Sequence, residues 1–412
     1  MWLAQAKRPS EFAVVSHSAC RRSNELCVNV DHFINSHCSV TMVNHGTVLY
    51  PISNNPYDDV ELLYNALEGL GDQFDTVTEI VGHRSLQQRL EIEKAFQQRY
   101  QKDFLQALSS QLTSDYEMLV KNLFRLPMNL LAHDLYKSMK GIGSAQRVMT
   151  NIICCCNNTE IYLLKKSYAN LLEQLEKNKN VSHRSLETDV RKNAKGPYGI
   201  LLDEILKCER YEDTPEDIEM AQKSSDISRL VDQRLVAKDV EDLYLASEEP
   251  KGKADSKVFI NILTKRSKLH IKSLWVAYKK AHGVNLVQTI KGKFSEPLRT
   301  GLNTMIRYPN YHLNKRKFGW SVTLVLSNVS VSIVMAQVNL RLLLACQIYE
   351  SMARLGTHES DLIRIICLHS ECDLRDIAND YKECFGVDMR DAIKADTSGH
   401  FQKLLLVLLG DR

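Results

Sequence analysis

The chain carries almost no excess charge of either sign. Its 412 residues include 53 Lys and Arg against 50 Asp and Glu, a formal net charge of +3. This balance excludes the strong positive field with which proteins attract nucleic acid, so we expect no nucleic-acid partner. The same small charge still permits contact with an anionic membrane surface. Hydrophobic residues at 44% and charged residues at 25% are ordinary for a globular chain.

The signatures of a disulfide framework and of a secretory leader are also missing. The 11 cysteines are an odd number with no Cys-x-x-Cys pair, and Cys154, Cys155 and Cys156 are consecutive, which suits disulfides poorly. Met1–Ser18 has no basic segment followed by an unbroken apolar core. We therefore predict reduced thiols in a cytosolic protein.

No catalytic motif is present. The 13 histidines contain no His-Glu-x-x-His, and the chain has no P-loop, nucleophile elbow or dinucleotide fingerprint. Cys367, His369 and Cys372 lie close together in the sequence. Burial in a helical region explains these three better than a zinc site. We therefore predict that the protein is not an enzyme.

What the sequence does contain is one helical pattern repeated four times. Near the C-terminus, apolar residues recur at i, i+3, i+4, i+7 and i+8, from Phe401 to Leu409, and Gly410 follows as a stop signal. The same apolar face occurs three times upstream, at Tyr116/Leu119/Val120/Leu123/Phe124, Tyr198/Leu201/Leu202/Ile205/Leu206 and Leu298/Gly301/Leu302/Met305/Ile306. Such a face indicates a helix that is buried on one side.

A second set of positions fixes the register of the four copies. Gln111, Asn193, Lys293 and Asp396 each lie five residues before the first apolar position of their copy. Each is preceded, three residues earlier, by an apolar residue that ends a short amphipathic run: Leu108, Val190, Ile290 and Ile393. The chain is therefore predicted to be a fourfold helical repeat whose units cover one another's apolar faces.

These repeats resemble those of the annexin family. The fourth copy contains Met-Ala-Arg-Leu-Gly-Thr at 352–357, Asp-Leu-Arg-Asp-Ile at 373–377 and Asp-Thr-Ser-Gly at 396–399. Leu-Glu-Gly-Leu-Gly at 67–71 with Arg-Ser-Leu-Gln-Gln-Arg at 84–89 resembles a first annexin repeat, and Met-Lys-Gly-Ile-Gly at 139–143 a second. The resemblance covers roughly 56–412 apart from insertions, and the insertions are similar to those of annexins from parasitic flatworms.

The resemblance implies an all-α fold, in which four annexin-type five-helix repeats form a curved disc. We expect an irregular N-terminal tail and long insertions between repeats 2 and 3 and between repeats 3 and 4. The expected boundaries are a tail at 1–55, repeat 1 at 56–126, repeat 2 at 130–208, a connector at 209–235, repeat 3 at 237–307, an apolar insertion at 308–343 and repeat 4 at 344–412. In repeat 1, Ser85 and Gln88 form the pattern of a capping box.

One uncharged segment, 318–340, is long enough to span a bilayer. Its many Ser, Thr, Asn and Gln residues dilute it, and its β-branched content favours an extended conformation over a helix. A membrane span here would also separate repeat 4 from the other repeats. We therefore expect an extended insertion that lies on the helical core, with a transmembrane segment as the alternative.

Calcium binding follows from the resemblance and from the chemistry of the loops. Ca²⁺ prefers about six to eight oxygen ligands. A helix that ends in a glycine-rich turn exposes carbonyl groups without intrahelical partners, and glycine permits the positive φ that makes them converge. In annexins, an Asp or Glu about 42 residues after the first loop glycine completes the site. The remaining positions bind water or a lipid phosphoryl oxygen.

Repeats 4 and 2 provide the best candidate sites. Repeat 4 offers carbonyl groups of Met352, Arg354 and Gly356 with the carboxylate of Asp396, although Arg354 stands where the family has glycine. An Arg there costs about 1 kcal/mol or more if the left-handed conformation is required. Repeat 2 offers Met139, Gly141 and Gly143, but Asn193 occupies the acidic position. A neutral amide ligates Ca²⁺ more weakly than a carboxylate.

Repeats 1 and 3 are weaker candidates. Repeat 1 has Leu67, Gly69 and Gly71 with Gln111 at the acidic position. In repeats 1 and 2, a loop that survives only as a helix turn is an equally weighted alternative. Repeat 3 has Lys253 for the second glycine and Lys293 at the acidic position, and this cation is expected to exclude Ca²⁺.

The predicted function is calcium-dependent binding to acidic phospholipid membranes with a reduced set of calcium sites. The expected cofactor is calcium, the expected partner is acidic phospholipid, and the N-terminal tail is a candidate site for a protein partner. The expected location is cytoplasmic, at the inner face of the plasma membrane or at other membranes. The alternatives are a calcium-independent degenerate annexin that acts as a scaffold, and an integral protein anchored through 318–340.

Overall fold

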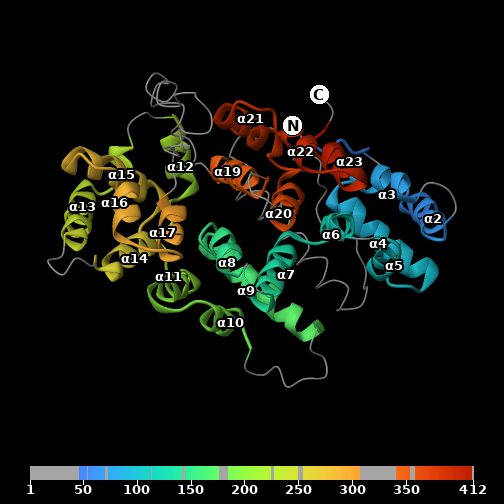
Figure 1. Cartoon of the computed structure of the whole chain (residues 1–412), viewed down its shortest axis with the longest axis horizontal. Coiled ribbons are helices and arrows are strands. Elements are labelled where there is room, and N and C mark those ends of the chain that lie inside the picture. The colour runs from blue at the N-terminus through green and yellow to red at the C-terminus, as the bar shows by residue number, and fades with distance from the viewer. Residues whose placement is uncertain are drawn as a thin grey trace, which may run out of the picture.

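The described part of the chain is built of helices in four groups. The computed structural model describes residues 46–52, 54–69, 73–112, 114–141, 143, 145–175, 184–223, 227–248, 254–306, 340–352 and 358–410. Viewed down the shortest axis of the molecule, the groups surround a common centre (Figure 1). The all-α prediction is confirmed: each repeat has five α-helices, and no strand occurs in these residues.

The helices follow one another in the same order in every repeat. Repeat 1 contains α2 (Pro56–Leu67), α3 (Gln73–Gly82), α4 (Leu86–Tyr100), α5 (Phe104–Gln111) and α6 (Ser114–Leu123). Repeat 2 contains α7 (Pro127–Lys140), α8 (Ala145–Ile153), α9 (Asn158–Leu175), α10 (Leu186–Asn193) and α11 (Gly196–Leu206). Repeat 3 contains α13 (Gln233–Ser247), α14 (Ser256–Lys265), α15 (Lys268–His282), α16 (Leu286–Lys293) and α17 (Leu298–Ile306). Repeat 4 contains α19 (Leu340–Met352), α20 (Glu359–His369), α21 (Leu374–Phe385), α22 (Met389–Asp396) and α23 (Gly399–Leu408).

Two repeats begin earlier than their sequence pattern suggests. Helix α13 starts at Gln233, inside the expected connector, and α19 starts at Leu340, inside the expected apolar insertion. The connector is also partly helical, with α12 (Pro215–Lys223) and a short 3-10 helix at Ser228–Leu230. The uncharged segment lies outside the described residues except for Leu340. No helix within the described ranges is long and apolar enough to cross a membrane.

Side-chain caps explain where several helices begin. Ser85 and Gln88 form the predicted capping box at the start of α4, since each side chain bonds the other residue's backbone N–H. Ser185 and Thr188 do the same for α10. Asp103 caps α5 through the N–H of Gln106. At the C-terminus, Gly410 adopts φ 75°, as expected for a helix stop.

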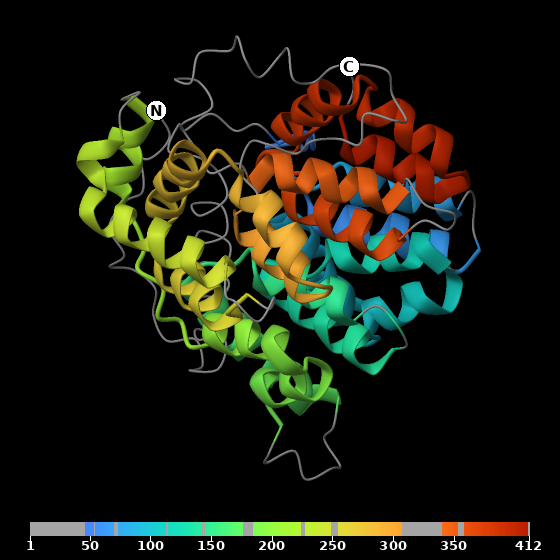
Figure 2. The ribbon, with the colours of Figure 1, turned by 60° about the vertical axis from the view of Figure 1, so that its left-hand side comes forward.

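The repeated apolar faces are buried, but in two separate cores. One core combines repeats 2 and 3, and the other combines repeats 1 and 4. Tyr116, Leu119 and Leu405 lie in the second core, whereas Tyr198, Leu201 and Leu302 lie in the first. In Figure 2 the orange and red helices of repeat 4 lie against the blue and blue-green helices of repeat 1, where α20 packs on α6 and α23 packs on α3 and α6. The molecule is therefore two halves, each made of two repeats.

A polar seam joins the two halves. Arg364 of α20 ion-pairs with Asp134 of α7 at 3.3 Å and donates to Asp361 at 2.7 Å. Arg147 of α8 also pairs with Asp361. Arg364 and both carboxylates are almost fully buried. Removing one partner of such a network lowers the free energy of unfolding strongly, because it leaves a buried charge without compensation.

Glu93 of α4 lies close to this seam. Burial and the nearby carboxylate of Asp103 together raise the pKa of Glu93 to about 7, although Arg125 opposes the shift. Because the folded pKa exceeds the ordinary value, the native state binds more protons between pH 4.5 and 7. Stability therefore falls as pH rises through this window.

We predict that Glu93→Gln stabilises the protein at pH 8 by up to roughly 2–3 kcal/mol and changes little at pH 5. Urea unfolding at the two pH values measures the difference. Glu91→Gln is the control, since Glu91 is exposed on the same helix. An equal gain at both pH values would contradict the assignment.

The last residues of the predicted tail pack on the helical body. The N–H groups of Thr47 and Val48 both donate to the carbonyl of Ser370, at 2.7 and 3.1 Å. Gln88 of repeat 1 donates to the Pro51 carbonyl at 2.8 Å. Gly410 is required here because a Cβ on it would lie 2.6 Å from the Thr47 carbonyl oxygen. Residues 46–52 therefore connect repeats 4 and 1, while residues 1–45 lie outside the described part.

Candidate calcium-binding loops

In repeat 4, the candidate carboxylate lies at the end of a short helix. Asp396 is the last residue of α22, and Thr397 caps this helix through the Ile393 carbonyl. Met352 ends α19. The N–H of His358 donates to the Ser351 carbonyl at 2.9 Å, which brings the two ends of the loop together. Arg354 and Gly356 lie outside the described residues, so their placement as ligands stays a prediction.

Asp396 faces a cavity at the junction of repeats 1 and 4. The cavity has a volume of about 390 Å³. Its lining includes Asp396, Glu359 at the start of α20, and Asp115 of repeat 1. Phe74, Tyr116 and His400 form its aromatic wall, and the Phe74 and His400 rings are stacked at 4.5 Å. Glu359 follows the repeat 4 loop closely, so Asp396 lies on the side of the repeat where this loop returns.

In repeat 2, the loop glycines have two different conformations. Gly143 has φ 90°, a left-handed conformation that favours glycine. Gly141 is extended, with φ −83° and ψ 179°, and its N–H bonds the Lys137 carbonyl. Met139 is half-buried in the last turn of α7. The alternation of an extended glycine with a left-handed one is the geometry that exposes successive carbonyl groups.

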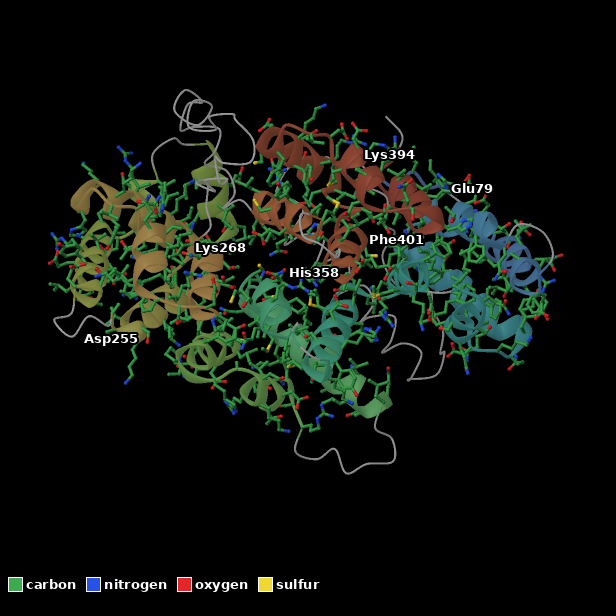
Figure 3. The ribbon with its side chains drawn as sticks, viewed as in Figure 1. Glu79, Asp255, Lys268, His358, Lys394 and Phe401 are labelled. Atoms are coloured by element: carbon green, nitrogen blue, oxygen red, sulfur yellow. The ribbon has the colours of Figure 1, made fainter. Side chains whose placement is uncertain are left out.

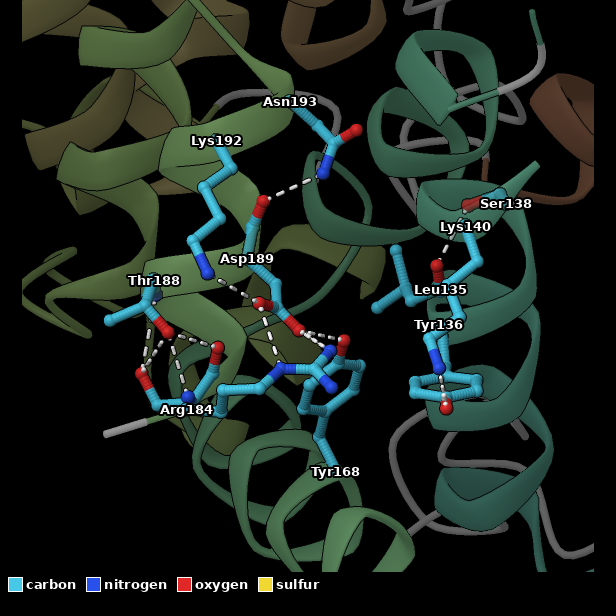
Figure 4. Close-up of polar contacts among 11 residues, drawn as sticks. Leu135, Tyr136, Ser138, Lys140, Tyr168, Arg184, Thr188, Asp189, Lys192 and Asn193 are labelled. Atoms are coloured by element: carbon cyan, nitrogen blue, oxygen red, sulfur yellow. Dashed lines mark hydrogen bonds and ion pairs between the residues drawn. The ribbon is translucent and has the colours of Figure 1, made fainter. Parts of the chain in front are cut away.

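Asn193 is the last residue of α10. Its Nδ2 donates to the Asp189 carbonyl at 2.9 Å, and its side-chain oxygen points away from α10 (Figure 4). Asp189 itself binds Arg184 and accepts from Tyr168 at 2.7 Å. Burial alone would raise the pKa of Asp189, but these bonds outweigh burial and lower it. A charged, fully engaged Asp189 therefore anchors α10, while Asn193 at its end keeps an amide oxygen directed outward.

Two further features of the loops belong to repeats 2 and 1. Lys140, at the end of α7, bonds the Tyr136 hydroxyl and lies 4.3 Å from the ring centroid (Figure 4). In repeat 1, Gly69 has φ 84°, and Gln111 is exposed at the end of α5. Gly71 lies outside the described residues. Within the described ranges, no group of three or more His, Cys, Asp or Glu side chains is arranged to hold a metal ion.

Repeat 3 contains an ion pair in the place of a calcium site. Lys293 at the end of α16 lies 3.2 Å from Glu248, which follows the end of α13. The N–H of Asp255 donates to the Ala246 carbonyl at 2.9 Å, so the ends of this loop are also close together. A carboxylate and an ammonium group thus join the two turns that a calcium ion would otherwise bridge. Lys253 lies outside the described residues.

The described cysteines contribute packing. Cys372 is buried, and no disulfide joins two described cysteines. Burial raises the pKa of Cys367 to about 12. His369 Nδ1 lies 2.7 Å from Asp373 Oδ1 within the same helical region. Burial and these contacts explain Cys367, His369 and Cys372 without the zinc site that was the alternative interpretation of their spacing.

A fourfold repeat of five helices with these loops is typical of a class of calcium- and membrane-associated proteins. Comparison with known proteins identifies the family. The Annexin family model matches residues 58–123, 238–304 and 344–408. Annexin A13 of Schistosoma japonicum is 31% identical over 364 residues, which cover 87% of this chain and 92% of that protein. The chain therefore belongs to the annexin family.

Solved structures agree with this assignment. Chicken annexin V, in a complex with Zn²⁺, superposes with a TM-score of 0.70 at 28% identity, covering 89% of this chain and 99% of that one. The calcium-bound structure of annexin (Sm)1 shares the fold at 24% identity, with a TM-score of 0.68 and coverage of 89% and 94%. The family model does not match repeat 2, although its five helices are present.

Proposed function

We propose that this annexin binds acidic phospholipid membranes in a calcium-dependent manner, with repeat 4 as its principal calcium site. The observation that carries the proposal is the position of Asp396, at the end of α22 and beside the start of α20, where the repeat 4 loop returns. A single carboxylate with several loop carbonyl groups suits a hard cation. Calcium then bridges protein and headgroup phosphate.

Repeats 1 and 2 are proposed as weaker sites. Both have a glycine in the left-handed conformation, at Gly69 and Gly143, but both have an amide where a carboxylate is needed. An amide oxygen ligates Ca²⁺ without neutralising its charge. We propose that repeat 3 binds no calcium, because the ammonium group of Lys293 already occupies the bridging position. The protein would act from the cytoplasm as a peripheral membrane protein.

The test is cosedimentation with phosphatidylserine-containing vesicles in calcium and in chelator, at physiological salt. Pelleting that requires calcium supports the proposal. Equal pelleting under both conditions would support the rival function, a calcium-independent scaffold. Carbonate extraction of cell membranes tests the second rival, since a peripheral protein is released and a protein anchored through 318–340 is retained.

We further predict that Gln111→Glu strengthens calcium-dependent binding. The substitution places a carboxylate at the exposed end of α5, and it lowers the calcium concentration for half-maximal pelleting by roughly three- to tenfold, because affinity follows ligand charge. Gln106→Glu adds the same charge at the other end of this helix and serves as the control. A similar gain from both variants would argue against a site in repeat 1.

A further inference from the structure

The two halves of the molecule carry opposite charge. Repeats 2 and 3, at 130–208 and 237–307, contain 26 Lys and Arg against 15 Asp and Glu, a net charge of +11. Repeats 1 and 4, at 56–126 and 344–412, contain 15 against 24, a net charge of −9. The near-neutral total conceals this division, which follows the division of the hydrophobic core into two.

The positive charge of the basic half, repeats 2 and 3, reaches the side that carries the loops. Lys195 follows α10 in the turn to α11, Lys257 opens α14 directly after the repeat 3 loop, and Lys291 lies in the last turn of α16. All three side chains belong to exposed residues. At the corresponding side of repeats 1 and 4, the cavity is lined instead by Asp115, Glu359 and Asp396.

Two carboxylates of the acidic connector reduce positive charge at the opposite end of the basic half. Glu209 pairs with Lys265 at the C-terminal end of α14, at 2.6 Å. Asp213 accepts from the N–H of Leu269 at the start of α15. A ten-residue helix is about 15 Å long, so these carboxylates lie well away from the loop at its start. Figure 3 labels Asp255 at the start of α14 and Lys268 at the start of the next helix, α15.

The loop of repeat 3 is closed without calcium. The ion pair between Lys293 and Glu248 joins its two turns at 3.2 Å. Repeat 2 has a different arrangement of charge: its first helix ends in the cation Lys140, and the neutral Asn193 takes the acidic position. Repeat 3 therefore gains no cation when calcium rises, and its loop side keeps the same positive charge at every calcium concentration.

From these observations we propose that the loop side of the basic half is a calcium-independent docking surface for anionic phospholipid, and that calcium then brings the acidic half to the same membrane. The proposal extends the proposed function. An anionic bilayer attracts each nearby Lys or Arg and repels carboxylates. The basic half therefore binds first and alone in chelator. Calcium bound at Asp396 would then allow the acidic half, repeats 1 and 4, to bind the anionic bilayer that otherwise repels it.

The test uses the full chain in chelator with vesicles of phosphatidylserine and phosphatidylcholine. At about 0.02 M salt the protein is expected to pellet with these vesicles but not with phosphatidylcholine alone, and at about 0.3 M salt it is expected to dissociate, because screening shortens the reach of charge. The triple variant Lys195→Glu, Lys257→Glu, Lys291→Glu is expected to bind at least about tenfold more weakly in chelator.

The matched control reverses three exposed cations at the end of the molecule away from the loops of repeat 3: Arg229 of the connector, Arg234 at the start of α13 and Lys268 at the start of α15, each to Glu. It changes net charge equally and is expected to bind within about twofold of the unmodified protein. Equal loss in both triple variants would overturn the proposal, as would absence of pelleting at low salt in chelator. Self-association lost in the loop-side variant, without vesicle binding, would assign this surface to a second copy and also overturn it.

The Asp396→Ala variant separates this proposal from the proposed function. It is expected to keep chelator-resistant binding at low salt while losing the increment that calcium adds. Chelator-resistant binding that is unchanged in the lysine variant would contradict the docking surface, and it would leave the proposed calcium site untouched.

Discussion

Asp396→Ala is expected to remove most calcium-dependent membrane binding. Asp396 is the one carboxylate that the four loops place at the position where annexins complete their site, because the others are Gln111, Asn193 and Lys293. Without it, the carbonyl groups of repeat 4 hold calcium with no compensating charge. We expect the calcium concentration for half-maximal vesicle binding to rise roughly 100-fold.

Vesicle cosedimentation across a calcium titration measures this effect. Asp391→Ala is the matched control, since it removes the same charge from the other end of α22. The control is expected to shift the midpoint less than about twofold. Circular dichroism checks that both variants fold. If the two variants titrate alike, the principal calcium site is not in repeat 4.

Asp239→Asn is expected to cause the largest loss of stability among single substitutions outside the loops. Asp239 of α13 is 1% exposed, binds Arg266 through two bonds of 2.6 and 2.9 Å, and lies 2.8 Å from His270 Nε2. Replacing it with a neutral amide leaves the guanidinium group without its counter-charge. Breaking a buried pair in this way costs about 3–5 kcal/mol.

The pH dependence of this loss follows from the direction of the pKa shift. Burial alone would raise the pKa of Asp239, but the bonds from Arg266 and His270 prevail and lower it. The stabilisation is therefore fully present above the unfolded pKa, near 4, and is lost as pH falls through the lower folded pKa. Urea unfolding at neutral pH and below pH 3 tests this.

Asp242→Asn is the control for Asp239→Asn. Asp242 pairs with Lys238 on the exposed side of the same helix. Such surface pairs contribute about 0.3–0.5 kcal/mol. A loss from Asp239→Asn no larger than that of the control would mean that the buried pair does not stabilise the attachment of α13 to α14 and α15.

The sequence predicts the helices well because their information is local. The spacing of Tyr116, Leu119 and Leu123 defines a buried face without knowledge of what covers it. The capping box at Ser85 and the stop at Gly410 depend on residues a few positions away. The segment that packs on each apolar face cannot be predicted from neighbouring residues, because repeat 1 shares its core with repeat 4, almost 300 residues later.

The candidate calcium sites also combine features that nearby residues predict with features that only the tertiary structure reveals. Register alone aligns Asn193 and Asp396 at the same position of their repeats, and in the structure they are the last residues of α10 and α22. The pair between Lys293 and Glu248 could not be read from spacing, because it depends on the tertiary packing that brings the end of α13 close to the end of α16. The early start of α19 at Leu340 also escapes the pattern, because the uncharged residues before it read as an extended segment.

The shared core of the first and last repeats has a consequence for biosynthesis. The apolar faces of α3 and α6 are covered by α20 and α23, which leave the ribosome long after α3 and α6 have done so. Repeats 2 and 3 can assemble with each other while translation continues, but the apolar helix faces of repeat 1 stay exposed until repeat 4 has been made. A chaperone that meets the nascent chain would therefore contact the N-terminal quarter for longest, and a premature stop codon before α20 would yield an insoluble product.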